Sequence, residues 1–118
     1  MREPAPSIVE PGERRLHRRA VLDKPVLIET DSRSGNARAV DVGASGIAVR
    51  TDLPLREGER VSIYFELPIG YAVETMAVVV RRDGDVIALR FVDPPREAVI
   101  AVRGFCRISG VMPAARAG

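Results

Sequence analysis

The chain has 118 residues, of which 46% are hydrophobic, 29% charged and 4% aromatic, with a formal net charge of +2. This length suits one domain and is too short for two, and the scarcity of aromatic residues predicts an aliphatic core. The single cysteine excludes an internal disulfide and a cysteine-based zinc site, and no apolar run approaches the ~20 residues of a membrane-spanning helix or resembles a signal peptide. We therefore expect a cytoplasmic protein that does not insert into a membrane.

The chain begins with a proline-rich segment and a dense basic cluster. Residues 1–12 hold three prolines and little that can be buried, which predicts a flexible N-terminal leader. Four arginines follow directly before the first apolar segment: Arg14, Arg15, Arg18 and Arg19. Because they adjoin the leader, we expect them to be held loosely in the absence of a ligand.

Apolar segments with strand character follow, separated by turn residues. Alternation is clearest in 61–67, where Val61, Ile63 and Phe65 share one face. Ser34–Asn36 and Gly43–Gly46 are predicted turns, and Asp83–Gly84 is typical of a hairpin. The predicted strands span residues 25–30, 37–42, 47–51, 61–67, 72–82 and 86–92.

A helix is predicted near the end of the chain, over residues 94–108. Asp93 can cap it, Pro94 suits its first position, and apolar residues recur at helical spacing. Gly110 and Pro113 should end it, leaving 111–118 as a flexible tail. The pattern favours an all-β fold with a C-terminal helix, a six-stranded antiparallel, split or Greek-key-like β-barrel over residues 13–110, with the helix covering one open end.

The sequence offers little for catalysis. Its only histidine, His17, lies in the arginine cluster, and Cys106 falls on the apolar stripe of the predicted helix, where it reads as a buried packing thiol. Phosphate-binding glycine loops, paired catalytic carboxylates and metal-binding motifs are absent from the sequence. We therefore expect a protein that is not an enzyme and that needs no metal or cofactor.

The arginine cluster has three interpretations. It can be a solvated basic leader whose arginines form loose surface ion pairs with Glu10 and Glu13. It can attract nucleic acid or an anionic membrane non-specifically, although the predicted strands lack an aromatic platform for stacking bases, which makes nucleic acid an unlikely partner. It can also be a specific clamp, since arginine binds phosphate through two parallel hydrogen bonds and reads the O6/N7 edge of guanine.

The segment Asp41–Gly46 also has two interpretations. Aspartate and glycine are ordinary hairpin residues, and Gly43 and Gly46 can simply supply positive φ. Alternatively, the Asp41 carboxylate accepts the two N–H donors of a guanine edge, while the glycines let the backbone approach the ligand and its N–H groups bind an anion.

Together these two segments resemble the PilZ domain, a bacterial receptor for cyclic diguanylate (cyclic di-GMP). The family motif RxxxR is matched by Arg15–Arg19, and [D/N]xSxxG is matched by Asp41–Gly46 with one departure. Residues 78–82 and 88–93 resemble the final hairpin of the family, so the resemblance covers about residues 13–108.

The resemblance implies a six-stranded barrel with a C-terminal helix and a set of ligand contacts. Arg15 and Arg19 would hold the phosphates and contact guanine, and Arg14 would add a phosphate contact. Asp41 would bind a guanine edge, and Gly46 would leave room for the ligand. Ligand binding would order the N-terminal segment, and the reshaped surface would then signal to an unidentified partner protein.

The departure is at position 43, where the motif's serine is replaced by Gly43. The lost hydroxyl should weaken binding by about 0.5–1.5 kcal/mol unless Ser45 compensates for it. Gly43 therefore keeps a second hypothesis open, a degenerate PilZ-like interaction module that does not bind the nucleotide. A small RNA- or DNA-binding barrel is a third, which the modest net charge and few aromatics disfavour.

Overall fold

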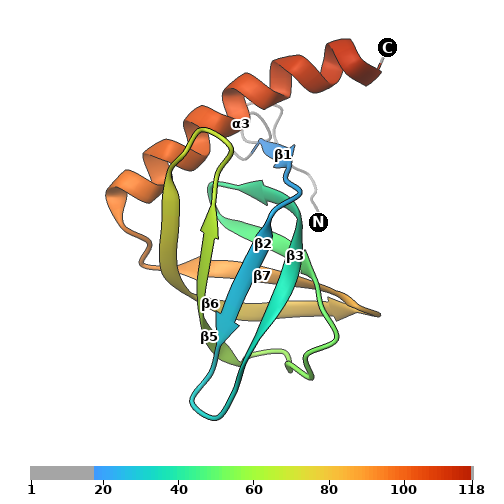
Figure 1. Cartoon of the computed structure of the whole chain (residues 1–118), viewed down its shortest axis with the longest axis vertical. Helices are drawn as coiled ribbons and strands as arrows, with labels where there is room; N and C mark the ends of the chain where they lie inside the picture. Colours follow the sequence, from blue (N-terminus) through green and yellow to red (C-terminus); the bar gives the residue numbers. More distant parts are fainter. Residues whose placement is uncertain (1–17, 118) are drawn as a thin grey trace, which may run out of the picture.

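The computed structural model describes residues 18–117, with the side chains of residues 18–109. Its seven strands form one antiparallel sheet that is followed by a single helix (Figure 1). The elements are β1 (Arg19–Val21), β2 (Pro25–Glu29), β3 (Ser34–Gly43), β4 (Gly46–Arg50), β5 (Arg60–Glu66), β6 (Ala72–Asp83), β7 (Val86–Val92) and α3 (Arg96–Ala117).

Six of these strands close into a barrel, as predicted. They follow the order β3-β2-β5-β6-β7-β4, and β4 pairs back onto β3 to complete the ring. Strand β1 was not predicted, because its three residues lie at the end of the arginine cluster. It pairs with the end of β3, opposite β4, so residues 41–43 of β3 have a paired strand on each side.

The interior of the barrel is aliphatic, as the composition predicted. Alternate residues of each strand point inward, and in β5 these are Val61, Ile63 and Phe65, each almost fully buried. Phe65 stacks on Phe91 of β7 with ring centroids 6.4 Å apart. The same alternation leaves the other side chains on the outer face of the barrel, where the candidate site lies.

Two predicted turns are placed differently in the structure. Residues 34–36 belong to β3, and the turn before them is closed by Thr30 N–H donating to the Arg33 carbonyl at 2.7 Å. The second turn contains only residues 44 and 45, because Gly43 pairs with Gly46 across the hairpin. Neither of these glycines has a positive φ, so that part of the prediction is wrong. Gly84 does, as expected for its hairpin.

The helix begins and ends later than predicted. Asp93 has a φ of 47°, which is not the conformation of a helix N-cap, and the Pro95 carbonyl accepts the first helical hydrogen bonds, from Ala98 and Val99. The helix then continues to Ala117, beyond the expected end at residue 108. Gly110 weakens a helix, and Pro113 both removes an N–H donor and crowds the carbonyl four residues before it, yet α3 continues through both positions.

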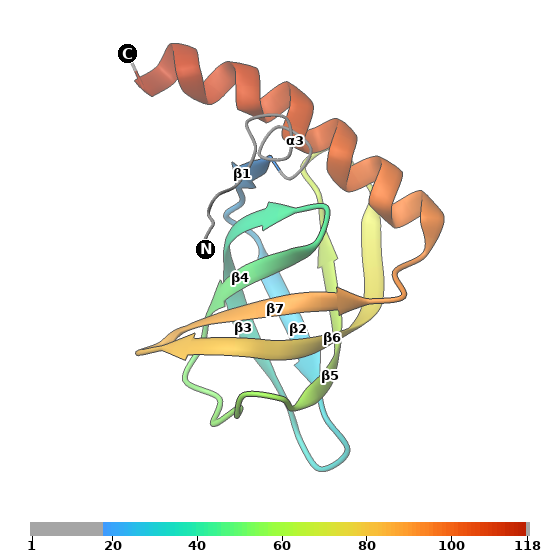
Figure 2. The ribbon, with the colours of Figure 1, turned by 180° about the vertical axis from the view of Figure 1, so that it is seen from behind.

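Helix α3 covers one end of the barrel, and its second half extends beyond it (Figures 1 and 2). Its buried side chains are Ala98, Val102, Phe105 and Cys106, and the helix contacts β1, β3 and β6. Within the described residues, no helix is long and apolar enough to cross a membrane.

Candidate functional site

Two β-bulges turn charged side chains out of the barrel. In β3 the inward residues are Ala37 and Ala39, so strict alternation would send Asp41 into the core. A bulge between Ala39 and Asp41 shifts the pattern by one residue, so that Val42 is buried and Asp41 is not. A second bulge, between Val79 and Arg81 in β6, turns Arg81 outward in the same way.

The strand register places these residues in two neighbouring rows across β3, β4, β7 and β6. The first row pairs Asp41 with Ala48, Ala48 with Ala88, and Ala88 with Arg81. The second row begins on β1 and joins Arg19, Gly43, Gly46 and Arg90. Directly paired residues share a face of the sheet, so two glycines and two alanines form a low floor between charged walls.

All members of these rows except Gly43 line an open cleft of about 480 Å³ on the outer face of the barrel. Arg19 and Asp41 form one wall, Arg81 and Arg90 form the other, and Ser45 lies at the end of the floor. The volume is within the range of about 300–1,000 Å³ that is usual for small-molecule sites. Because three of the four wall side chains are guanidinium groups, the cleft is suited to an anionic ligand.

The wall formed by Arg19 and Asp41 is an ion pair. Arg19 Nη2 lies 2.7 Å from Asp41 Oδ1, Arg19 Nε donates to the same oxygen at 2.8 Å, and Nη2 also donates to the Gly46 carbonyl at 3.3 Å. The side chains are 41% and 36% exposed, so the pair stabilises the fold by less than about 1 kcal/mol. An anion therefore competes for Arg19 with a weak internal partner.

Gly43 lies beneath the side chain of Arg19. A Cβ atom at this position would be 3.0 Å from Arg19 Nη1 and 3.2 Å from its Cγ and from the Arg18 carbonyl oxygen. A side chain at position 43 would therefore push the Arg19 side chain or the Arg18 backbone aside by a few tenths of an ångström. The residue that departs from the family motif is directly coupled to the ion pair.

Gly46 is required by the barrel itself. A Cβ atom there would overlap the Leu89 carbonyl oxygen and would lie 3.1 Å from Arg90 Cα, both of which belong to the backbone of β7. The close approach of β4 and β7 therefore explains this glycine without any ligand. The resemblance had implied that Gly46 leaves room for the ligand, and it does form part of the cleft floor.

The structure brings together Arg19, Asp41, Ser45 and Gly46 from the predicted site, with Gly43 below them. Arg14 and Arg15 lie outside the described residues. Sequence reasoning missed Arg81 and Arg90 as wall residues. The only signal for Arg81 is a break in the inward alternation of β6, and Arg90 is reached only through the strand register.

Cys106 connects the helix to this part of the sheet. Its buried Sγ donates a hydrogen bond to the Val42 carbonyl at 3.2 Å, between Asp41 and Gly43 in the chain. Burial raises the pKa of the thiol, while the nearby guanidinium groups of Arg19 and Arg18 act in the opposite direction. The thiol therefore stays protonated at neutral pH and packs in the core, as predicted.

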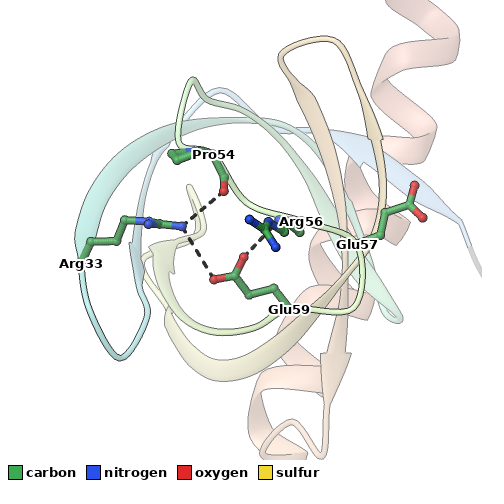
Figure 3. Close-up of a pocket in the computed structure, with 5 residues that line it drawn as sticks. All are labelled: Arg33, Pro54, Arg56, Glu57 and Glu59. Carbon is green, nitrogen blue, oxygen red and sulfur yellow. Dashed lines mark hydrogen bonds and ion pairs between the residues drawn. The ribbon is translucent and has the colours of Figure 1, made fainter.

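A second pocket, of about 560 Å³, lies around the loop that precedes β5 (Figure 3). Arg33 donates to the Pro54 carbonyl at 3.2 Å and lies 4.0 Å from Glu59, whose other oxygen accepts the Arg56 N–H at 3.0 Å. Of the charged side chains drawn there, Arg33 and Glu59 lie close to each other and hold the loop through Pro54 and the Arg56 backbone, while Glu57 points away from them. Although this pocket is larger than the cleft, its polar contacts serve to hold the loop in place, and we do not assign a ligand to it.

Within the described part of the chain there is no group of three or more histidine, cysteine, aspartate or glutamate side chains placed to hold a metal ion. The cleft presents guanidinium and carboxylate groups around a floor of glycine and alanine, and the half-exposed Val80 also lines it.

Several solved structures share this fold at low sequence identity. The Bacillus subtilis inhibitor of motility MotI/DgrA has a TM-score of 0.73 and 23% identity, over 80% of this chain and 50% of its own. The PilZ domain of Escherichia coli YcgR, with cyclic di-GMP, has a TM-score of 0.66 and 14% identity, over 86% and 95%. Borreliella burgdorferi PlzA, in complex with cyclic di-GMP, has a TM-score of 0.57 and 15% identity, over 88% and 50%. The chain thus spans about half the length of the first and the last of these proteins.

No curated protein sequence matches the chain. The family comparison does give a match, because residues 13–107 fit the PilZ domain, almost the range over which the two motifs and the final hairpin suggested it. PilZ domains are receptors or adaptors for cyclic di-GMP, which they bind without a metal cofactor, and they are not enzymes. The chain belongs to the PilZ domain family.

Proposed function

We propose that this chain is a cyclic di-GMP receptor that binds its ligand in the cleft between the Arg19–Asp41 wall and the Arg81–Arg90 wall. The observation that carries the proposal is the pair of cross-strand rows, which flank a floor of glycine and alanine with three guanidinium groups and one carboxylate. The ligand has two phosphates and two guanines. Guanidinium groups suit the phosphates and the O6/N7 guanine edge, and a carboxylate suits the opposite guanine edge.

In this proposal Arg19 and Asp41 exchange partners when the ligand binds. Their direct contact at 2.7 Å must open so that Arg19 can donate to phosphate and Asp41 can accept from guanine N1–H and N2–H. Because the exposed pair contributes little stability, its loss costs less than the new charge-assisted bonds contribute. We propose that Arg14 and Arg15 add phosphate contacts from the preceding segment. We also propose that the Ser45 hydroxyl contacts the ligand at the end of the cleft floor.

The opposite wall should contribute to affinity through Arg81 and Arg90. The Asp41–Ala48–Ala88–Arg81 row crosses three strand spacings, roughly 14 Å, so one ligand with several charged groups can contact both walls. We expect the double variant Arg81→Ala/Arg90→Ala to bind cyclic di-GMP at least tenfold more weakly, by about 1.4 kcal/mol or more, in a calorimetric titration. Arg50→Ala is the matched control, because Arg50 points outward from β4 but pairs with Asp85 at 3.0 Å and does not line the cleft. Equal affinities of the double variant and the natural chain would remove the second wall from the site.

Gly43→Ser should tighten binding. The new side chain displaces Arg19 from its place above Gly43, which weakens the competing bond to Asp41, and it also restores the motif hydroxyl. Together these effects should raise the affinity a few-fold to tenfold, for about 0.5–1.5 kcal/mol. The measurement is a titration beside Ala44→Ser, which adds a hydroxyl one residue away. Unchanged or weaker binding by Gly43→Ser would show that the glycine does not limit the site.

PilZ domains are not enzymes, so the domain itself passes on a signal through contacts and not through a reaction. We propose that ligand binding holds the N-terminal segment against the barrel and that the resulting surface signals to a partner protein in the cytoplasm. Amide hydrogen exchange in residues 8–20 is the direct readout. Exchange that is equally fast with and without saturating ligand argues against this step while leaving the binding proposal intact.

The binding proposal is tested by calorimetric titration with cyclic di-GMP at near-physiological salt, with GTP as the control nucleotide. Saturable binding at micromolar or lower Kd, absent with GTP, establishes a receptor, and the stoichiometry tells one bound ligand from a stacked pair. An absence of both heat and thermal stabilisation at high ligand concentration would favour the ligand-independent interaction module. The self-paired Arg19 and Asp41 and the missing motif serine are the features that would then explain the loss.

A further inference from the structure

The outer face of β2, β5 and β6 carries an apolar cluster that is separate from the cleft. Leu27, Tyr64 and Met76 point outward from these strands and are 39%, 40% and 42% exposed. Leu27 pairs directly with Tyr64, and Met76 lies diagonally from Tyr64, so the three side chains are neighbours. Strand β2 lies in front of β7 in Figure 1 and behind it in Figure 2, so this face is turned away from the cleft floor on β4 and β7.

The strand register sets the positions that surround Tyr64 on the outer face. They are Leu27 and Glu74 directly opposite, Ser62 and Glu66 along β5, and Pro25, Glu29, Ala72 and Met76 on the diagonals. Three of these positions hold a glutamate and none holds a basic residue. The three glutamates are exposed, and none of them belongs to an ion pair among residues 18–109. These residues form the Tyr64 face, which is apolar at its centre and acidic around it.

A small pocket of about 220 Å³ lies between Leu27 and Tyr64 on this face. It is also lined by Lys24, Pro25, Asn36 and Glu66. The volume is below the range of about 300–1,000 Å³ that is usual for small-molecule sites, and it suits a single side chain. Because side chains that fill such pockets are the usual anchors of protein interfaces, the pocket favours a protein partner that inserts one residue.

Basic residues lie at the margin of the Tyr64 face. The guanidinium of Arg38 is already held by Asp23 at 2.6 Å. Arg60 is at the start of β5, on the far side of Ser62 from Tyr64, and Lys24 lines the pocket from the residue before β2. These cations offset the three glutamates only in part, so the surroundings of the tyrosine stay acidic.

The charge of this face selects its occupant. Carboxylates repel the phosphates of nucleic acid and of anionic membranes, which disfavours both. A second copy that pairs face to face about a two-fold axis would bring the two sets of glutamates together. A head-to-tail contact would join copies into rings or filaments, and a net charge of +2 gives copies no long-range attraction for one another. A basic segment of a different protein suits both the pocket and the charge.

We infer that the Tyr64 face docks a basic segment of a partner protein. The segment inserts one apolar side chain between Leu27 and Tyr64, and its lysines or arginines pair with the surrounding glutamates. A cationic group of the segment can also lie on the tyrosine ring. The inference does not depend on the ligand cleft, because the cleft is lined by other residues.

The test uses two displayed libraries of peptides, about 12 residues long and roughly 40 Å when extended, with the full chain as bait. Both carry one central apolar residue, surrounded by lysine and arginine in one library and by aspartate and glutamate in the other. We expect enrichment only from the basic library. A synthetic peptide of the enriched sequence should bind Leu27→Thr/Tyr64→Thr and Glu29→Lys/Glu66→Lys/Glu74→Lys at least about tenfold more weakly. Threonine keeps the strand propensity of the residues that it replaces.

Charge reversal and a second exposed surface provide the controls. The triple lysine variant should instead enrich the acidic library. Glu97→Lys/Ile100→Gln changes the same kinds of residue on the exposed side of α3 and should bind the basic peptide normally. Equal enrichment from both libraries, no enrichment, or binding that ignores the variants of the Tyr64 face overturns the inference. So does self-association in ultracentrifugation that is lost in Leu27→Thr/Tyr64→Thr, whose cyclic di-GMP titration should be unchanged.

Discussion

Arg19→Ala should bind cyclic di-GMP at least about 100-fold more weakly than the natural chain, a loss of about 3 kcal/mol. Arg19 is the one motif arginine within the described residues that lines the cleft, and its guanidinium already reaches Asp41 at 2.7 Å and the Gly46 carbonyl at 3.3 Å. Each hydrogen bond to a charged group is worth about 1.5–3 kcal/mol, and a bidentate contact to phosphate uses two of them. Removing the guanidinium therefore costs more than any neutral contact in the site.

The same change should leave the fold almost untouched, because an exposed ion pair contributes less than about 1 kcal/mol. The matched control is Arg38→Ala, which removes an exposed arginine of β3 that is also ion-paired, with Asp23 at 2.6 Å, but lies outside the cleft. Arg19→Lys separates charge from geometry, since lysine keeps the charge and loses the planar fork. Natural affinity in Arg19→Ala, measured by calorimetry on a sample with an unchanged thermal midpoint, would place the ligand elsewhere on the molecule.

Gly46→Ala should destabilise the protein by about 3 kcal/mol, a large share of the 5–15 kcal/mol that keeps a typical domain folded. The added methyl group would overlap the Leu89 carbonyl oxygen, and its other close neighbours, Leu89 C and Arg90 Cα, are also backbone atoms. Because no rotamer change relieves a backbone clash, β4 and β7 must separate. The Gly46–Arg90 pair is at the end of that ladder, and β4 closes the barrel onto β3.

Chemical denaturation of the ligand-free protein measures the loss in free energy of unfolding. In thermal denaturation, the Tm should fall by roughly 10 °C. Gly104→Ala is the matched control, because it adds the same methyl group where nothing lies within 4 Å and should stabilise the helix by roughly 0.5–1 kcal/mol. If Gly46→Ala kept its stability and lost only ligand affinity, the glycine would serve the ligand and the role assigned to the strand contact would be wrong.

The sequence predicted the parts of the fold that follow from local patterns. Alternating apolar residues and turn residues located all six barrel strands, and the range of β7 agrees residue for residue. Strand β1 was not predicted, because its three residues are stabilised by contacts with β3 and α3 and not by their own sequence pattern. The two bulges were not predicted either, because Val40 and Val80 are apolar and are typical of an uninterrupted strand.

The candidate site was predicted only where its residues are close in the sequence. The Asp41–Gly46 segment is contiguous, and the link to Arg19 came from a family resemblance. Arg81 and Arg90 join them through strand register, which no local pattern reveals. The role of Gly46 in the close contact of β4 with β7 could not be predicted either. The Leu89 carbonyl oxygen that requires this glycine belongs to a strand 43 residues further along the chain.

The placement of Arg19 on β1 has a consequence for what an affinity measurement reports. This strand has three residues, hydrogen-bonds to β3 along one edge, and is not needed to close the barrel. Detaching it should therefore cost less free energy than global unfolding, and we expect the folded barrel to include a population in which Arg19 is absent from the wall. The apparent Kd equals the intrinsic Kd divided by the fraction of molecules in which β1 is attached. A substitution under β1, far from any ligand atom, can thus weaken binding by lowering that fraction alone.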